Sequence, residues 1–292
     1  MASRLPALLQ RAEHDLFVPI TFALSRRLEQ IEWDELVEDR GLAVFTVHSS
    51  LRTFSADGVV NWFDSWLEAE SAGARCERGA DGRVTRPAEP LAVVPDAEAI
   101  VKGRSVSAAL DIASRLCQQT GERGLVLGYI TGPVTLHHRL YGADRKADAA
   151  SLELCAKVAT SMARAYCDAG ISALLIAEEE PAGDPAAVEA LTPLFNLAEY
   201  YGAPVVYLSR SPAPAPVAES LKRLGAWIAD AEGAAGEVVA IPLGEANAAA
   251  CAQAWRAAAA GGVRRMVLSN WDIPADTPPE DVIGLAQQIG TN

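Results

Sequence analysis

The sequence predicts one closed (β/α)8 barrel of the TIM type. Eight short apolar, β-branched runs alternate along the chain with longer amphipathic stretches, which is typical of repeated β–α units on a parallel sheet. The runs are apolar throughout instead of alternating with polar residues, as expected for strands that helices cover on both faces. A chain of 292 residues has the length that one such barrel needs.

The eight expected strands are spread over the whole chain. They are FVPITFAL (17–24), GVVNWF (58–63), LVLGYI (125–130), ALLIAE (173–178), PVVYLS (204–209), AWIADA (226–231), EVVAIPL (237–243) and RRMVLSN (264–270). Each of the last five is followed, or nearly so, by helix-like sequence. A doubly wound open sheet is the alternative, but neither G-x-G-x-x-G nor G-x-x-x-x-G-K-[ST] follows any strand, so a nucleotide-binding sheet has little support.

Two segments depart from this alternation. Residues 70–100 are rich in Gly, Pro and charge and lead into a long helix expected near 98–120, which predicts an excursion from the barrel near 70–120. Residues 210–217, RSPAPAPV, form a proline-rich loop after the fifth strand. Both are either surface connections or parts of a site, because long loops after strands build the sites of barrels. No change in composition marks a second domain, so we expect one domain over residues 1–292.

Charge and hydropathy exclude several classes of function. The chain has 25 basic and 38 acidic residues and a net charge of −13, which argues against a general nucleic-acid binder and against adhesion to anionic membranes. No apolar stretch approaches the ~20 residues of a membrane helix, and the N-terminus lacks the apolar segment of a signal peptide. We therefore expect a cytoplasmic protein, whose five cysteines are reduced.

Barrel enzymes carry their chemistry at the carboxyl ends of the strands, and here carboxylates follow two of them. Asp64 ends the apolar run VVNWFD; it could bind an N–H-bearing ligand, act as an acid or base, or cap the following helix. At the end of the fourth strand, Glu178 and Glu180 should share an orientation that Glu179 does not. We take Asp64, Glu178 and Glu180 as catalytic candidates.

Two adjacent histidines follow the third strand in LGYITGPVTLHHRLYG. The turn at Gly132-Pro133 leads into a helix expected to begin near Thr135. Adjacent helical residues diverge by about 100°, so at most one histidine can face a ligand, and the i, i+4 spacing of a helical metal pair is absent. We take His137 as a catalytic candidate and His138 as a substrate contact.

Further substrate contacts are expected among aromatic and polar residues at the strand ends. These are Trp62, Tyr129, Thr131, Tyr207, Ser209, Asn270 and Trp271. Together with the carboxylates they predict an aromatic and acidic mouth, which suits a flat or partly apolar small molecule.

Three stretches resemble motifs of the uroporphyrinogen decarboxylase superfamily, which includes methyltransferases such as methylcobalamin:coenzyme M methyltransferase. GYITGPVTLHHRLYG resembles its G-F-x-G-x-P-[FW]-T-L segment, and DGVVNWFDSWLEAESAG resembles its pocket-aspartate segment. LSNWDIPADTPPEDV resembles its ending, G-H-G-I-L-P-D-T-P or, in the methyltransferases, G-C-G-I-P-P-D-T-P. The three matches lie in order over roughly residues 57–285.

The resemblance implies a (β/α)8 barrel, commonly a homodimer, in which Asp64 takes the place of the aspartate that binds pyrrole N–H groups in the decarboxylases. Two features depart from that pattern. The motif R-Q-A-G-R-Y, which supplies arginines for substrate carboxylates, has no counterpart in VPITFALSRR, and Trp271 stands at the position of the C-terminal His. Uroporphyrinogen decarboxylation would then lack charge neutralisation, so we do not expect that activity.

The zinc methyltransferases of the superfamily carry H-x-C after the fifth strand and a Cys in G-C-G near the end. Here the corresponding positions hold Tyr207-Leu208-Ser209 and Trp271. Since no cysteine remains there for zinc to activate, we expect no zinc and no other metal.

The resemblance therefore implies an enzyme that moves a methyl group between a small compound, for example a methoxylated one, and a corrinoid or pterin carrier. Corrinoid or tetrahydrofolate would be a co-substrate, with no tightly bound cofactor, and a corrinoid carrier protein would be a partner. One alternative is a decarboxylase of a porphyrinogen or other carboxylated ring compound. Another is a non-catalytic barrel that binds a corrinoid or tetrapyrrole.

Overall fold

All eight expected strands are present in the computed structural model, which describes residues 4–79, 82–121, 124–179, 182–229, 237–246, 248–259 and 265–290. They are β1 (Leu16–Val18), β2 (Gly58–Val60), β5 (Leu125–Thr131), β6 (Ala173–Glu178), β7 (Val205–Ser209), β8 (Trp227–Ala229), β9 (Val238–Ile241) and β10 (Met266–Ser269). Two further short strands, β3 (Glu77–Arg78) and β4 (Val84–Arg86), form an antiparallel hairpin outside the barrel.

The strands follow one another round a barrel in chain order. Parallel ladders join β2-β5-β6-β7-β8 and β9-β10-β1. At one seam β1 lies beside β2, where the Asp57 N–H donates to the Phe17 carbonyl at 2.8 Å. At the other seam β8 lies against β9. The neighbour order thus returns to its start, and the fold is a (β/α)8 barrel, as predicted.

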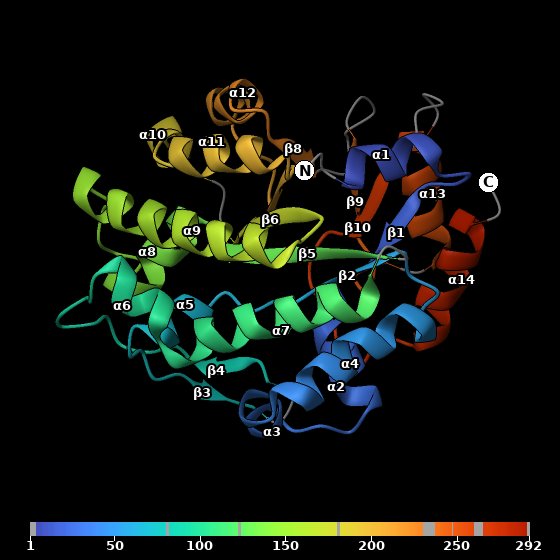
Figure 1. Cartoon of the computed structure of the whole chain (residues 1–292), viewed down its shortest axis with the longest axis horizontal. Coiled ribbons are helices and arrows are strands. Elements are labelled where there is room, and N and C mark those ends of the chain that lie inside the picture. Colours follow the sequence, from blue (N-terminus) through green and yellow to red (C-terminus); the bar gives the residue numbers. More distant parts are fainter. Residues whose placement is uncertain are drawn as a thin grey trace.

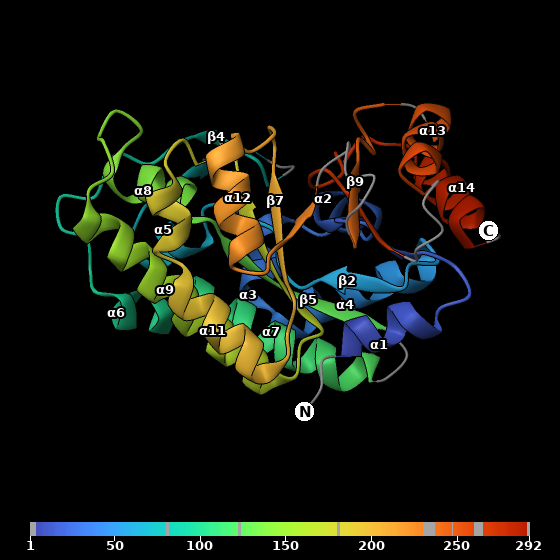
Figure 2. The same cartoon turned by 90° about the horizontal axis from the view of Figure 1, so that it is seen from above.

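Helices cover the outside of the strands (Figures 1 and 2). In chain order they are α1 (Arg4–Arg11), α2 (Phe22–Leu28), α3 (Trp33–Glu38), α4 (Arg40–Thr53), α5 (Leu67–Ser71), α6 (Ala97–Lys102), α7 (Arg104–Thr120), α8 (Pro133–Tyr141), α9 (Ala149–Ala169), α10 (Pro185–Glu189), α11 (Thr192–Tyr201), α12 (Ala215–Arg223), α13 (Ala248–Ala259) and α14 (Pro279–Gly290). The long helices α7, α9 and α11 lie beside one another, and α13 packs on α14 near the C-terminus (Figure 1).

Helix α9 shows how local sequence and packing combine. Asp148 caps its first turn by accepting a hydrogen bond from the Ser151 N–H at 2.8 Å, and Gly170 ends it in the left-handed conformation. Its apolar face is buried against β5, where a Cβ on Gly128 would lie 2.8 Å from the Tyr166 ring. The glycine in this strand therefore sets how closely the helix approaches the barrel.

The structure departs from the expected boundaries in three places. The first strand ends at Val18 instead of continuing to residue 24, because Phe22–Leu28 forms α2. The second strand ends at Val60 instead of residue 63. The helix expected near 98–120 is divided at Gly103, where a Cβ would lie 2.3 Å from the Ser71 Oγ. The ends of the expected strands 226–231 and 264–270 lie partly outside the described residues.

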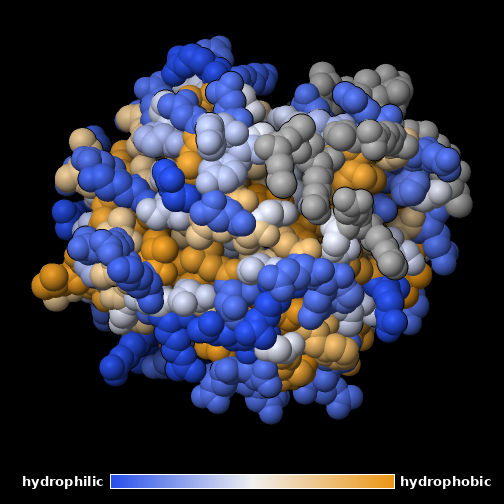
Figure 3. All heavy atoms as spheres, viewed as in Figure 1, coloured by the Kyte–Doolittle hydropathy of each residue, from blue (hydrophilic) through white to orange (hydrophobic). Residues whose placement is uncertain are grey.

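On the face seen in Figure 3, hydrophobic residues gather in a band across the middle, with hydrophilic residues above and below it. Exposed Phe45 and Tyr200 add apolar area to the surface as a whole. No helix in the described part of the chain is long and apolar enough to cross a membrane.

Gly58 allows β2 to approach β5, so we expect Gly58→Ala to destabilise the protein. The new Cβ would lie 2.6 Å from the Leu125 Cβ and 2.9 Å from its carbonyl oxygen, and such overpacking costs about 1–3 kcal/mol. Urea unfolding would measure the change. Gly284→Ala is the matched control: it lies within α14 with no atom near its added methyl, and should raise the free energy of unfolding by about 0.5–1 kcal/mol. Equal stability of the two variants would contradict this packing argument.

Candidate functional site

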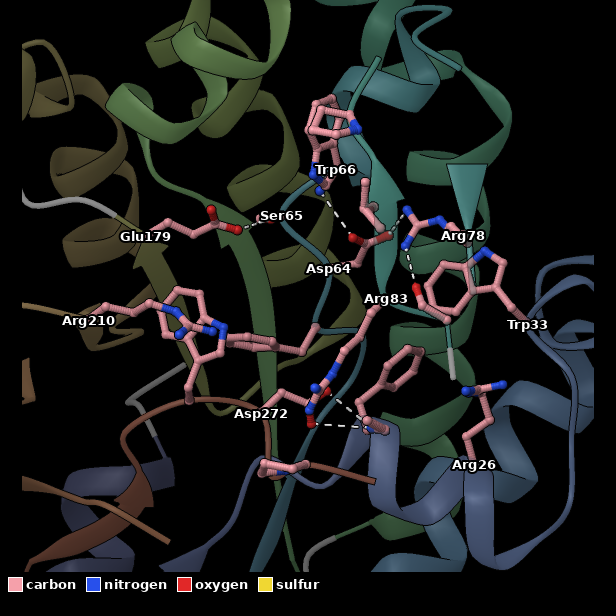
Figure 4. A pocket seen from close by; sticks show the side chains of 18 of the residues that line it. Arg26, Trp33, Asp64, Ser65, Trp66, Arg78, Arg83, Glu179, Arg210 and Asp272 are labelled. Atoms are coloured by element: carbon pink, nitrogen blue, oxygen red, sulfur yellow. Dashed lines mark hydrogen bonds and ion pairs between the residues drawn. The ribbon is translucent and has the colours of Figure 1, made fainter. Parts of the chain in front are cut away.

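A cavity of about 500 Å³ opens at the carboxyl ends of the barrel strands. Its wall comes from the segments that follow β1, β2, β6, β7, β9 and β10, from α8, and from the β3–β4 hairpin with Trp33 (Figure 4). The excursion predicted near 70–120 thus contributes to the site through its hairpin.

Three arginines of this wall each lie over the ring of a tryptophan. The guanidinium-to-ring distances are 4.2 Å for Arg78 over Trp33, 4.4 Å for Arg139 over Trp66 and 4.6 Å for Arg210 over Trp271. All six side chains line the cavity. Stacking attracts the cation to the ring face and fixes the plane of the guanidinium, so that its edge remains able to bind an anion.

Asp64 lies in the cavity wall as the sequence predicted, and it holds Arg78. Its carboxylate accepts hydrogen bonds from the Arg78 guanidinium at 2.8 Å and from the backbone N–H of Trp66 at 3.1 Å. Arg78 also pairs with Glu70 at 2.6 Å. Burial and the nearby charge of Asp64 raise the pKa of Glu70, against the opposing charge of Arg78. Asp64 is therefore the link between the loop after β2 and the hairpin that covers the cavity.

Of the three consecutive glutamates, Glu179 lines the cavity. It accepts hydrogen bonds from Arg139 and from the Ser65 hydroxyl. Burial alone would raise its pKa, but the charge of Arg139 and these hydrogen bonds lower it below the usual value. Glu179 therefore stays ionised and orients Arg139, whose buried Nε has no hydrogen-bond partner among the described residues.

Glu178 points away from the cavity and caps α8. Its carboxylate accepts from the backbone N–H groups of Val134 (3.0 Å) and Thr135 (2.8 Å) and from the Thr135 hydroxyl (2.6 Å). A Cβ on Gly132 would lie 2.2 Å from the Glu178 Cδ, so the glycine of the Gly132-Pro133 turn makes room for this cap. Burial raises the pKa of Glu178 to about 7. Glu180 lies outside the described residues.

The histidine pair also lies outside the cavity wall as described. His137 is fully buried, with Nε2 at 2.8 Å from the Arg145 carbonyl and its ring 5.0 Å from that of Tyr141. His138 is half-buried, with its ring 5.9 Å from that of His137. The helix begins at Pro133, two residues before the expected start.

Two of the other predicted substrate contacts pack behind residues that line the cavity. Trp62 packs on Phe22 and Tyr129 packs on Phe63, with ring centroids 5.0 and 4.8 Å apart, and the two phenylalanines line the cavity. Thr131, Tyr207 and Ser209 do not line it.

Two residues of the last predicted motif are at the cavity or next to it. Trp271 lines the cavity, and Asn270 donates to the cavity carboxylate Glu245 at 3.0 Å.

Asp272 is a cavity residue that the sequence analysis did not select. Its two oxygens accept from the Ala23 N–H at 3.2 and 3.1 Å, and its side chain lies beside Arg83 (Figure 4). Burial raises its pKa to about 8, although backbone N–H groups and the charges of Arg83 and Arg26 act in the opposite direction. Asp272 is thus mostly protonated at neutral pH. Its sequence signal was its place at the carboxyl end of the eighth expected strand, in NWD, where the motif that this stretch resembles has glycine.

The sequence analysis predicted an acidic mouth. The structure corrects this prediction, because arginines outnumber carboxyl groups in the described lining. The described lining includes five arginines, namely Arg26, Arg78, Arg83, Arg139 and Arg210. It includes four carboxyl groups, those of Asp64, Glu179, Glu245 and Asp272. VPITFALSRR lacks the decarboxylase motif but still contributes Arg26, and the hairpin contributes two more arginines.

The donor set does not fit zinc. At the positions where the zinc methyltransferases named above carry their ligands, this chain places Tyr207, Ser209 and Trp271, which offer neither thiolate nor imidazole. Within the described ranges, no three His, Cys, Asp or Glu side chains are grouped to hold a metal ion.

Comparison with solved structures finds a full-length likeness. A methyltransferase from Methanosarcina mazei matches with a TM-score of 0.76 and 17% sequence identity, over 98% of each chain. The chain has the fold of this methyltransferase. The barrel implied by the motif resemblance is therefore confirmed over the whole length.

Two further matches have TM-scores below 0.5 and support no argument. The carboxyl transferase domain from Rhizobium etli pyruvate carboxylase has a TM-score of 0.45 and 9% identity, over 99% of this chain and 49% of that chain. Endo-beta-N-acetylglucosaminidase from Cordyceps militaris has a TM-score of 0.42 and 12% identity, over 84% and 94%. No protein-family model and no curated protein matches the sequence.

Two buried carboxyl groups near the site should make stability depend on pH. Glu68, fully buried, accepts from the Thr131 N–H at 2.9 Å, and burial raises its pKa from 4.5 to about 7, as for Glu178. Because the folded pKa is raised, each group favours the folded state fully below pH 4.5, and this contribution is lost as pH rises through 7. Each contribution is about 3 kcal/mol.

Asp272, whose pKa is raised to about 8, loses its stabilising contribution over the same range. We therefore expect Glu68→Gln to reduce the fall in unfolding free energy between pH 4.5 and 7 by about a third. Denaturant unfolding at a series of pH values would measure it. Glu98→Gln, which changes an exposed pair with Lys102, is the control and should keep the full slope. An unchanged slope in Glu68→Gln would show that Glu68 does not titrate in this range.

Proposed function

We propose that the chain is a methyltransferase-like enzyme of the uroporphyrinogen decarboxylase superfamily. It would move a methyl group between a small compound, such as a methoxylated one, and a corrinoid or pterin carrier. The three motif resemblances and the likeness of fold support this class of reaction. The observation that carries the proposal is the carboxyl group of Asp272 in the wall of an aromatic cavity, where burial raises its pKa to about 8.

A methoxy compound needs a proton at the moment its methyl group leaves. The bond between oxygen and methyl breaks, the methyl group bonds to the nucleophilic carrier, and the oxygen would leave as an anion unless an acid protonates it. Asp272 holds such a proton below about pH 8. Phe63 and Trp271 meet edge to face with centroids 5.0 Å apart beside it and offer an apolar surface for the body of the substrate.

The arginines would bind an anionic group on the same compound. Asp64 and Glu179 hold Arg78 and Arg139 in position, so that these cations are fixed before a ligand arrives. With Asp272 protonated, the described cavity lining carries a net positive charge. A carboxylate, sulfonate or phosphate on the substrate fits this arrangement.

The size of the cavity supports a separate carrier. About 500 Å³ accommodates one small molecule, whereas a corrinoid ring would have to approach the mouth on a carrier protein. Tetrahydrofolate is the other co-substrate that we propose. We also propose a cytoplasmic homodimer, for which the apolar band of Figure 3 offers a contact surface.

Replacing Asp272 tests the proposal directly. We expect Asp272→Asn to lower kcat for methyl transfer from methoxylated aromatic acids to cob(I)alamin by about 10²–10⁴-fold, the usual contribution of a general acid. The rate of the native protein should fall as pH rises through about 8, since the acid form is then lost.

The asparagine can still accept a hydrogen bond from the Ala23 N–H. A melting temperature of Asp272→Asn close to that of the native protein would therefore show that activity, and not the fold, is lost. Asp144→Asn, at an exposed position after α8, is the control and should keep full activity. Full activity of Asp272→Asn, or a rate that does not change near pH 8, would remove Asp272 from the mechanism.

The five cavity arginines favour one alternative, a decarboxylase of a carboxylated ring compound. They could neutralise the substrate carboxylates, as the arginines of the R-Q-A-G-R-Y motif do in the decarboxylases; this chain lacks that motif. Carbon dioxide would leave while the ring carbon takes a proton from Asp272. Release of carbon dioxide from porphyrinogens or aromatic acids, without methyl transfer, would favour this reading. Binding of cobalamin or porphyrin without turnover would favour the non-catalytic barrel.

A further inference from the structure

A second cavity of about 610 Å³ adjoins the first. Its wall is formed by the end of α2, the turn that leads to α3, the tip of the β3–β4 hairpin and the loop after β10. Arg26 and Arg83 line both cavities, and the loop after β10 lines the first with Asp272 and the second with Asp276. The two cavities therefore adjoin at Arg26 and Arg83, and both can present a guanidinium group to either cavity.

The wall of the second cavity is built by specific contacts. The buried Arg26 donates through Nη1 to the Ile31 carbonyl at 3.0 Å, which braces the turn after α2. In that turn Gln30 has φ of 57°, a left-handed conformation that is costly for a residue other than glycine and is often found at functional sites. Arg27 is tied to the opposite side of the cavity by a hydrogen bond to the Thr277 carbonyl at 3.2 Å.

Positively charged side chains outnumber carboxyl groups in the described lining of the second cavity. Arg26, Arg27 and Arg83 face Glu32 and Asp276 among its described lining. Arg27 lines only this cavity, and its side chain is exposed. A ligand anchored in the first cavity would thus meet a further guanidinium group, that of Arg27, when it extends past Arg26 and Arg83. In a chain of net charge −13, such a run of arginines is suited to a ligand with separated anionic groups.

We propose that the second cavity is a tail subsite that takes a carboxylate or phosphate at the far end of an elongated ligand. The head of this ligand occupies the first cavity and Arg27 binds its tail. The inference rests on the proposed function for the identity of the head group only. The ligand is thus an elongated molecule with an anionic group at each end. The motif resemblance does not specify such a ligand.

Calorimetric titration with alkane dicarboxylates of increasing length tests the subsite without any turnover. Monocarboxylates of matched length and ω-phosphono carboxylates complete the panel and distinguish a carboxylate tail from a phosphate tail. We expect affinity to rise sharply once the dicarboxylate is long enough to reach Arg27. Arg27→Gln should weaken binding of these long dianions about tenfold, which corresponds to about 1.4 kcal/mol, and leave short acids within about twofold.

Arg52→Gln, an exposed arginine near the end of α4, is the control and should bind every probe as the native protein does. Arg83→Gln should weaken both short and long anions, because Arg83 lines both cavities, while Arg86→Gln, in the adjoining strand β4, should not. Affinity that does not depend on length, or equal binding of long dianions by Arg27→Gln and native protein, would overturn the subsite. Since binding alone is measured, failure of methyl transfer would leave this result intact.

Discussion

The ion pair between Arg78 and Asp64 is the interaction on which the cavity depends. A two-stranded hairpin as short as β3–β4 has little stability of its own, so its position is set by what it touches. Arg78 pairs with Asp64 and Glu70, donates to the Gly82 carbonyl at 2.9 Å and lies over Trp33. These contacts fix the hairpin across the mouth of the barrel. They also place Arg83 beside Asp272.

The same wall keeps two carboxyl groups in opposite protonation states. Glu179 stays ionised because Arg139 and Ser65 compensate its loss of hydration. Asp272 receives backbone N–H groups and the charges of Arg83 and Arg26, which do not compensate its burial, so its pKa rises to about 8. Pairs of titratable groups whose environments separate their pKa values are a usual feature of acid–base sites. Burial outweighs the neighbouring charges at Asp272, whereas the neighbouring charges and hydrogen bonds outweigh burial at Glu179.

Sequence reasoning found what depends on local pattern and missed what depends on distant contacts. Continuous apolar runs identified the strands, and alternation correctly separated Glu178 from Glu179. The sequence around the two glutamates could not show which one faces the cavity. Glu178 turns away from it because its carboxylate accepts hydrogen bonds from the first turn of α8. The early end of β1 depends on Asp272, which caps α2 from 249 residues along the chain. The hairpin arginines lay in a segment without periodicity.

The contrast between an acidic chain and a cationic mouth limits how the site can attract a ligand. A net charge of −13 repels anions at long range, but at physiological ionic strength such repulsion is screened beyond about 8 Å. Inside the cavity walls the arginines act over shorter distances and with less screening. Attraction therefore begins only when an anion is already at the mouth. Selection then depends on the fixed guanidinium planes that the three tryptophans hold, so the geometry of the anionic groups on the ligand matters more than its total charge.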